Sequence, residues 1–111
     1  MYQCVNTLIQ GKMPKKTIAW NKYKTFDLFK AILALKDTEE CRRFFRDLCT
    51  LEEMADMADR WQMVKMIVKD IPYRDIAKKL DVSTTTVARV GDWLRHGAGG
   101  YRLMVRRLKL D

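Results

Sequence analysis

Residues 72–94, PYRDIAKKLDVSTTTVARVGDWL, contain two runs of helical apolar spacing separated by only Asp81 and Val82. The spacing predicts one helix over residues 73–80. A second helix is predicted to begin after Ser83, whose side-chain oxygen can cap the free N–H groups of a helix. The apolar side chains predicted to pack inward are Ile76, Ala77, Leu80, Val82, Val87 and Val90. Two short helices joined by a tight turn are typical of a helix-turn-helix.

The other face of this unit, which we place over residues 72–96, is polar and basic. The second helix of such a unit enters the major groove, where threonine and arginine side chains read base edges. The remaining cations are expected to neutralise phosphates. The residues predicted to contact DNA are Arg74, Lys78, Ser83, Thr84, Thr85, Ala88 and Arg89. Two plainer interpretations stay open: Ser83 can be a helix cap alone, and Lys78 can belong to a solvated face.

Charge is distributed unevenly along the 111 residues, whose net charge is +8. Residues 1–36 carry seven Lys or Arg and one Asp, and residues 37–59 carry three Lys or Arg and eight Asp or Glu. Residues 60–111, which include the helix-turn-helix, carry twelve Lys or Arg and five Asp, a net charge of +7. A basic block of this kind favours a polyanionic partner, although a solvated basic surface has the same composition.

Helical spacing covers most of the remaining chain. The further predicted helices cover residues 25–36, 37–48, 51–69 and 101–110, and Gly97 is predicted to end the helix before the last one. Asp37 and Thr50 each precede a glutamate by three residues, which is the pattern of a capping box. With no hairpin signal, the predicted fold class is all-α, with six helices in one domain over residues 24–111. Residues 1–23 lack a sustained period and are predicted to form a flexible arm.

The helices before the helix-turn-helix carry many large apolar side chains. They include Phe26, Phe29, Phe44, Phe45 and Trp61, more apolar surface than one thin layer of helices covers. An intertwined homodimer would bury this surface, and it is the predicted assembly. A monomeric helical bundle is the alternative.

Several classes of protein are disfavoured by the composition. The three cysteines form no CxxC pair and the single histidine has no thiol at zinc-site spacing, so we predict neither a metal site nor a disulfide. A reducing, cytoplasmic compartment is the expected location. The apolar runs are shorter than the roughly 20 residues of a membrane span. We predict no enzyme and no cofactor, because neither a catalytic triad order nor a glycine-rich phosphate loop occurs.

From about Thr25 to Leu110 the chain resembles the Trp-repressor superfamily. The segment LEEMADMADRWQMVKMIV (51–68) is similar to the central helix of that family, and STTTVARVGDWL (83–94) to its DNA-reading helix. The segment ECRRFFRDLCT (40–50) resembles the YerC/YecD-type subgroup in particular. The resemblance implies a six-helix, intertwined homodimer that binds DNA.

In the Trp repressor itself, tryptophan binds between the central helix and the reading helix, and the resemblance suggests an equivalent effector pocket. Thr50 matches a threonine that faces the ligand, Arg60 an arginine that stacks on the indole, and Arg89 the arginine that holds the carboxylate. Val90 stands where the repressor has glycine, and Trp93 where it has serine. Because both are larger, we predict that they occupy the space and that free tryptophan is not the effector. Another small effector stays open.

The predicted function is therefore that of a homodimeric transcriptional regulator, a repressor on the family pattern, that binds a palindromic operator in double-stranded DNA. The alternative is an adaptor or a small-molecule-sensing module without stable operator binding. Exposure of Arg74, Thr84 and Thr85 distinguishes the two, because a module that does not read DNA can cover these side chains with other helices.

Overall fold

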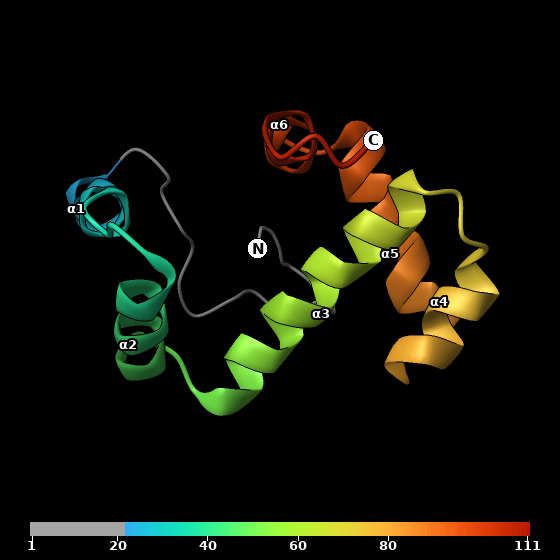
Figure 1. Cartoon of the computed structure of the whole chain (residues 1–111), viewed down its shortest axis with the longest axis horizontal. Coiled ribbons are helices and arrows are strands. Elements are labelled where there is room, and N and C mark those ends of the chain that lie inside the picture. The colour runs from blue at the N-terminus through green and yellow to red at the C-terminus, as the bar shows by residue number, and fades with distance from the viewer. Residues whose placement is uncertain (1–21) are drawn as a thin grey trace. The chain divides into compact units, whose positions relative to one another are not determined.

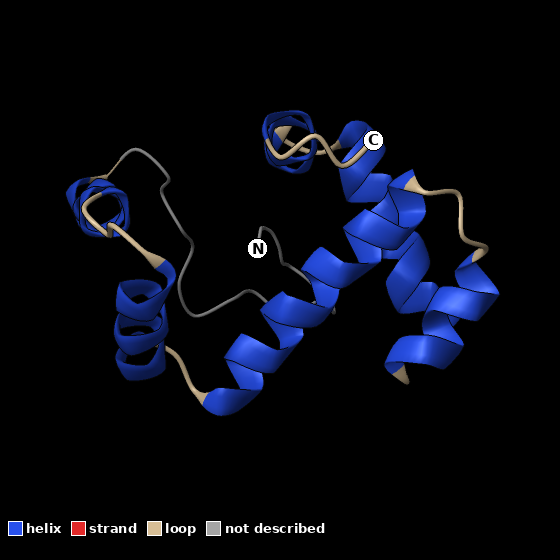
Figure 2. Cartoon of the chain, in the orientation of Figure 1, coloured by secondary structure: helices blue, strands red, loops and turns tan. Residues whose placement is uncertain are grey.

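The computed structural model describes residues 22–111, which fold into six α-helices without any strand (Figure 2). The helices are α1 (Tyr23–Leu33), α2 (Thr38–Leu48), α3 (Leu51–Val68), α4 (Tyr73–Leu80), α5 (Thr84–His96) and α6 (Gly100–Arg107) (Figure 1). The chain divides into two compact units, of which the second spans Arg46–Asp111. The predicted all-α class with six helices is confirmed. The predicted arm lies almost wholly outside the described residues.

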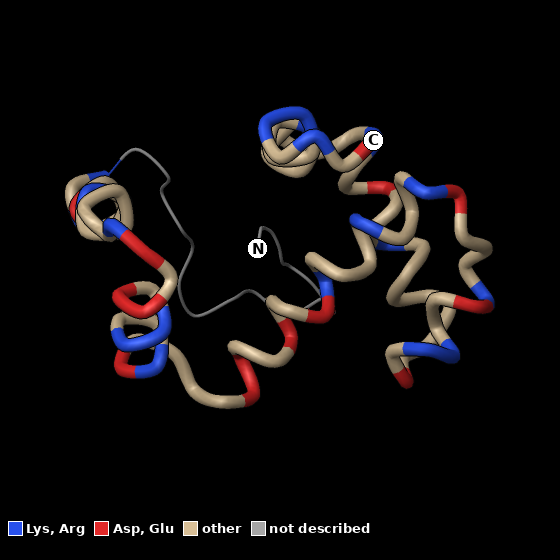
Figure 3. The backbone as a smooth tube through the Cα atoms, in the orientation of Figure 1, with Lys and Arg blue, Asp and Glu red and all other residues tan. Residues whose placement is uncertain are grey.

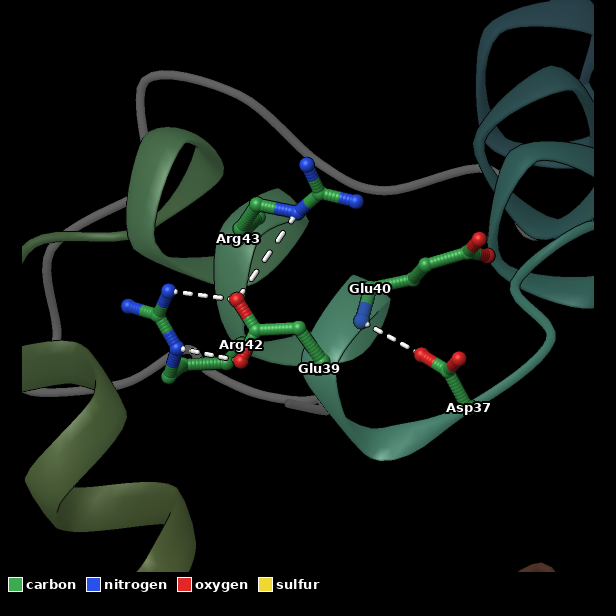
Figure 4. Close-up of polar contacts among 5 residues, drawn as sticks. All are labelled: Asp37, Glu39, Glu40, Arg42 and Arg43. Atoms are coloured by element: carbon green, nitrogen blue, oxygen red, sulfur yellow. Dashed lines mark hydrogen bonds and ion pairs between the residues drawn. The ribbon is translucent and has the colours of Figure 1, made fainter.

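Helices α1 and α2 belong mainly to the first unit, and neither buries a single side chain. The start of α2 follows its capping signal, because the Asp37 carboxylate accepts from the backbone N–H of Glu40 at 2.8 Å (Figure 4). The Glu40 carboxylate accepts in turn from the backbone N–H of Lys36 at 2.9 Å. Arg42 donates two hydrogen bonds to Glu39, which lowers the pKa of Glu39 and raises that of Arg42. Because this ion pair is fully solvated, it stabilises α2 only weakly.

The hydrophobic core lies in the second unit, where α5 packs on α3, α4 and α6, and α3 also packs on α4. Its buried side chains are Met63, Val64, Ile76, Ala77, Val87, Val90, Leu94 and Val105. Four of the six residues predicted to pack inward from the helix-turn-helix are therefore core residues. The other two, Leu80 and Val82, are half-buried against it. Among the described residues, no helix has both the length and the apolar composition that crossing a membrane requires.

Three helices of the second unit are followed by a non-glycine residue in the left-handed conformation. These residues are Asp70 after α3, Asp81 after α4 and Lys109 after α6. After α4, the backbone N–H of Val82 returns to the carbonyl oxygen of Ala77 at 3.0 Å, which satisfies an acceptor that the helix end leaves open. The φ of 57° at Asp81 reverses the chain direction, so a very short connection can join α4 to α5.

One prediction about the early helices is wrong in detail. Helix α1 begins two residues earlier and ends three residues earlier than the range 25–36. In α3, Met63 and Val64 are buried, both in the second half of the helix. Leu51, the first residue of α3, remains 66% exposed, because α4 and α5 pack against the later turns of α3.

Helix α6 ends at Arg107, three residues before the end predicted for it, and packs on the core through one face. Leu103, Met104 and Leu108 are exposed, whereas Val105 is buried. Tyr101 also faces the core, with its ring centroid 6.4 Å from that of Trp61. Burial raises the pKa of Tyr101, and the positive charge of Arg60 lowers it by a smaller amount.

The loop between α5 and α6 also differs from the prediction. Gly97 does not take the left-handed conformation expected after α5, since its φ is −83°. It is required for another reason: a Cβ at this position would overlap the carbonyl oxygen of Trp93. Gly99 takes the left-handed conformation instead, with a φ of 92°, immediately before α6.

Candidate functional site

The helix-turn-helix consists of α4 and α5, which pack on each other through one apolar side. Ile76 and Ala77 of α4 and Val87 of α5 are buried there. The same side of the pair packs on α3, which supplies Met63 and Val64. Because the apolar side packs in the core, the polar side of the unit remains in solvent.

All seven residues predicted to contact DNA lie on the exposed side of this unit. They are Arg74 and Lys78 on α4, Ser83 just before α5, and Thr84, Thr85, Ala88 and Arg89 in the first turns of α5. Figure 3 marks the basic positions of the second unit in blue. No other helix of the second unit covers these side chains. Exposure of Arg74, Thr84 and Thr85 is what we expect of a face that reads DNA.

The N-terminus of α5 is capped as predicted. The Ser83 hydroxyl oxygen accepts from the backbone N–H of Thr86 at 3.0 Å and lies 2.9 Å from the Thr86 hydroxyl. The first N–H groups of a helix have no acceptor within it, so those of Thr84 and Thr85 point away from α5 at the positive end of its dipole. Such an end favours anions, phosphate oxygens among them.

A contact between α4 and α5 was missed from the sequence. Gly91 is buried on α5, and a Cβ added there would overlap the hydroxyl oxygen of Tyr73. That hydroxyl accepts a hydrogen bond from Nη1 of Arg95 at 3.0 Å. The absence of a side chain at Gly91 thus lets the phenol of α4 lie directly against the backbone of α5. The only sequence signal was a glycine within a helical pattern, which does not identify its partner.

A cavity of about 290 Å³ lies between α3 and α5. It is lined by Asp56, Asp59, Arg60, Met63, Val82, Thr86, Arg89, Val90 and Trp93. Four of the five residues predicted for an effector pocket are thus brought together. The fifth, Thr50, is not part of the lining. It caps α3 instead, because its hydroxyl oxygen accepts from the backbone N–H of Glu53 at 3.0 Å.

Val90 and Trp93 both lie at the cavity wall. Val90 is buried in the core, whereas Trp93 is 42% exposed. The prediction that these two side chains take up the space that free tryptophan would need stays a prediction.

The polar lining of the cavity combines both signs of charge. Asp56 and Asp59 contribute carboxylates, and Arg60 and Arg89 contribute guanidinium groups. Within residues 22–111, the ion pairs at hydrogen-bonding range all involve Glu39, so these four groups do not neutralise one another directly. The arrangement suits a small ligand that carries both a cationic and an anionic group.

Comparison with known proteins agrees with this geometry. Residues 23–109 match the family model described as Trp repressor protein. The protein YerC of Bacillus subtilis (strain 168) is 40% identical over 82 residues, which cover 74% of this chain and 79% of YerC. The crystal structure of a TrpR like protein from Eubacterium eligens ATCC 27750 superposes with a TM-score of 0.78 at 38% identity, over 81% of this chain and 93% of that one.

A second solved structure, from Staphylococcus aureus, superposes with a TM-score of 0.77 at 35% identity and covers 82% of this chain and 91% of its own. The family model matches well over half of the chain, and the fold agrees over most of its length. The resemblance predicted from the central and reading helices is confirmed. The chain belongs to the Trp repressor family, in its YerC-type subgroup.

Proposed function

We propose that this protein is a DNA-binding transcriptional regulator that acts as a homodimer and represses transcription from a palindromic operator. One observation carries the proposal: the seven residues expected to contact DNA are all exposed on one face, while the opposite face of the same two helices forms the core. On this proposal, the protein works in the cytoplasm, where chromosomal DNA is its partner.

Each exposed residue has a defined part in the proposed interface. The N-terminus of α5 enters the major groove, where the hydroxyl and methyl groups of Thr84 and Thr85 contact base edges. Arg74 reads a guanine, and Lys78 and Arg89 neutralise phosphates. Ser83 orders the start of the reading helix through its cap, and the small side chain of Ala88 permits close approach of the helix to the groove.

The proposed homodimer follows from apolar side chains that the single chain leaves uncovered. Phe26 and Leu33 of α1 are 50% and 83% exposed, and Leu48 and Leu51 are also exposed. Large apolar side chains left in water at helical spacing mark an interface. A second copy of the chain supplies the same surface under two-fold symmetry, which places two reading helices on one duplex.

The proposal is tested by selecting duplexes from a random library and measuring affinity for the selected palindrome across a salt series. Wild-type protein is expected to prefer the palindrome over unrelated duplex by about 10³-fold or more. Arg74→Ala is expected to lower this preference by about tenfold, since a bidentate arginine–guanine contact contributes about 1–3 kcal/mol of discrimination. Its nonspecific binding is expected to persist.

Arg107→Ala is the matched control, because it removes the same charge from an exposed position on α6. It is expected to leave the preference for the palindrome unchanged. If Arg74→Ala leaves the preference for the palindrome unchanged, Arg74 does not read a base. Failure of the selection to enrich any duplex overturns the proposed function itself and favours the adaptor alternative.

The cavity between α3 and α5 supports a second role, the sensing of a small effector. Its two carboxylates and two guanidinium groups fit a zwitterionic ligand, but Thr50 is absent from its lining and Trp93 stands at its wall. We therefore expect tryptophan at millimolar concentration to change operator affinity less than twofold in the same binding assay. An increase of tenfold or more would establish tryptophan control instead.

A further inference from the structure

A second cavity, widely open to solvent, lies in the C-terminal unit, at the end of α5 opposite to its DNA-facing N-terminus. Its volume is about 400 Å³, and its lining residues are Val68, Leu94, Arg95, Arg102, Val105, Arg106 and Asp111. Leu94 and Arg95 belong to the last turn of α5, which is 13 residues long. The cavity is therefore roughly 15–20 Å from the reading end of that helix, at 1.5 Å per residue. A duplex bound by the N-terminus of α5 leaves this cavity free.

The charged part of the lining is strongly unbalanced. Three guanidinium groups, from Arg95, Arg102 and Arg106, share the cavity with one side-chain carboxylate, that of Asp111. No ion pair of the described residues joins any of these arginines to a carboxylate. Figure 3 shows how densely basic positions follow one another along α6 and its C-terminal extension. A site with this excess of positive charge attracts anions.

Two of the three arginines are oriented by neutral partners and keep most of their donors for a ligand. Nη1 of Arg95 donates to the hydroxyl of Tyr73 at 3.0 Å, and Nη2 of Arg102 donates to the backbone carbonyl of Arg95 at 3.1 Å. A guanidinium has five N–H donors, so each contact orients one of these two groups and leaves its other donors available. Orientation by neutral partners is what a site for carboxylate or phosphate oxygens requires.

The remaining lining is apolar. The half-buried Val68 offers apolar surface to the cavity, and the core residues Val105 and Leu94, only 4% and 8% exposed, lie at its floor. A bare inorganic anion gains nothing from such a surface. A compact hydrocarbon group does gain, at about 25 cal/mol for each Å² of apolar area removed from water.

We propose that this cavity binds a small organic anion in which a carboxylate or phosphate group is attached to a compact apolar group. The anionic group lies among the guanidinium groups of Arg95, Arg102 and Arg106, and the apolar group packs on Val68 and on the exposed edges of Leu94 and Val105. The site is distinct from the cavity lined by Arg60 and Arg89. It does not depend on DNA binding, so either property can fail without the other.

The test uses the full chain of 111 residues. Phenyl phosphate and phenylacetate are titrated by isothermal calorimetry, which also distinguishes a phosphate ligand from a carboxylate ligand. At least one is expected to bind saturably, with one molecule per chain. Inorganic phosphate lacks the apolar group and benzyl alcohol lacks the charge, so each is expected to bind at least tenfold more weakly. Equal binding of inorganic phosphate would overturn the proposal, because it indicates attraction by diffuse charge alone.

Two variants locate the site. Arg102→Gln and Arg106→Gln are each expected to weaken the better probe at least tenfold. Arg106 makes no hydrogen bond through its side chain to the described residues that could complicate its loss. Arg107→Gln is the matched control, since Arg107 is exposed on the same helix but does not line the cavity; a change below twofold is expected. Equal losses in Arg106→Gln and Arg107→Gln, or no loss in either cavity variant, would refute the assignment.

Discussion

The helix-turn-helix unit and the first two helices have the same kind of apolar spacing, but only the helix-turn-helix unit buries its apolar side chains. The C-terminal unit buries eight apolar side chains, whereas α1 and α2 bury none. In α1, Phe26 and Leu33 lie seven residues apart on one face and remain largely in solvent. Apolar spacing therefore identifies which face of a helix needs a partner but does not identify the partner.

The difference follows from how the chain returns on itself. Asp81 reverses direction in a left-handed conformation, so α5 packs at once on α4 and on the later turns of α3. A covered core then forms within about 45 residues, from Met63 to Val105. For α1 and α2, a second copy of the chain is the partner that our proposal supplies.

The largest loss of stability is expected in the core of the helix-turn-helix unit. Ile76 is fully buried, and its replacement by alanine removes apolar contacts and leaves a cavity. Ile76→Ala is expected to lower the free energy of unfolding by about 2–5 kcal/mol. Lys79→Ala on the exposed face of α4 is the control, with an expected change of about 0.5 kcal/mol or less. Urea unfolding at one fixed protein concentration measures both, and equal losses would show that α4 is not a core helix.

The next largest effect is expected on association. Phe26→Asp with Leu33→Asp places two charges on the apolar face of α1 and is expected to raise the dimer dissociation constant about 100-fold, or 2.7 kcal/mol. Lys24→Glu, on the opposite side of the same helix, changes the net charge by the same amount at an exposed position. It is expected to leave association unchanged. Sedimentation velocity over a dilution series measures this. If the double variant associates like wild type, the face of α1 is not part of the interface.

A smaller loss is expected from the contact between Gly91 and Tyr73. A methyl group at Gly91 overlaps the Tyr73 hydroxyl, so Gly91→Ala is expected to cost about 1–3 kcal/mol of stability. Adding Tyr73→Phe removes the hydroxyl and is expected to recover part of the loss. Gly100→Ala is the control, because no atom lies within 4 Å of a Cβ there and alanine favours helix α6. Thermal unfolding that ranks the two glycine variants equally would contradict the packing described.

The smallest effect is expected at the turn itself. Asp81→Gly relieves the cost of a side chain at a φ of 57° and is expected to raise stability by up to about 1 kcal/mol. Asp75→Gly, in the first turn of α4, is expected to lower stability by about 0.5–1 kcal/mol. Chemical unfolding therefore gives changes of opposite sign for the same substitution. Two losses would mean that the Asp81 side chain stabilises the turn in another way.

Much of the site was predictable because its signals are local. The cap at Ser83, the short turn and the inward face around Ile76 and Val87 depend on residues within a few positions of one another. The exposed face follows as the complement of the buried one. The Tyr73–Gly91–Arg95 contact was not predictable in this way, because a glycine within a helix does not indicate which side chain will approach it.

The amino-acid sequence alone determines where the six helices lie, which face of each is apolar and where two of them reverse on Asp81, since these depend on local spacing, capping and backbone conformation. The packing of the folded chain determines which apolar faces are covered. It buries Val105 of α6 and leaves Leu103 and Met104 exposed, and it brings Arg60, Arg89 and Trp93 around one cavity. Helix orientation is set by many weak contacts between distant residues, and no local pattern contains that sum.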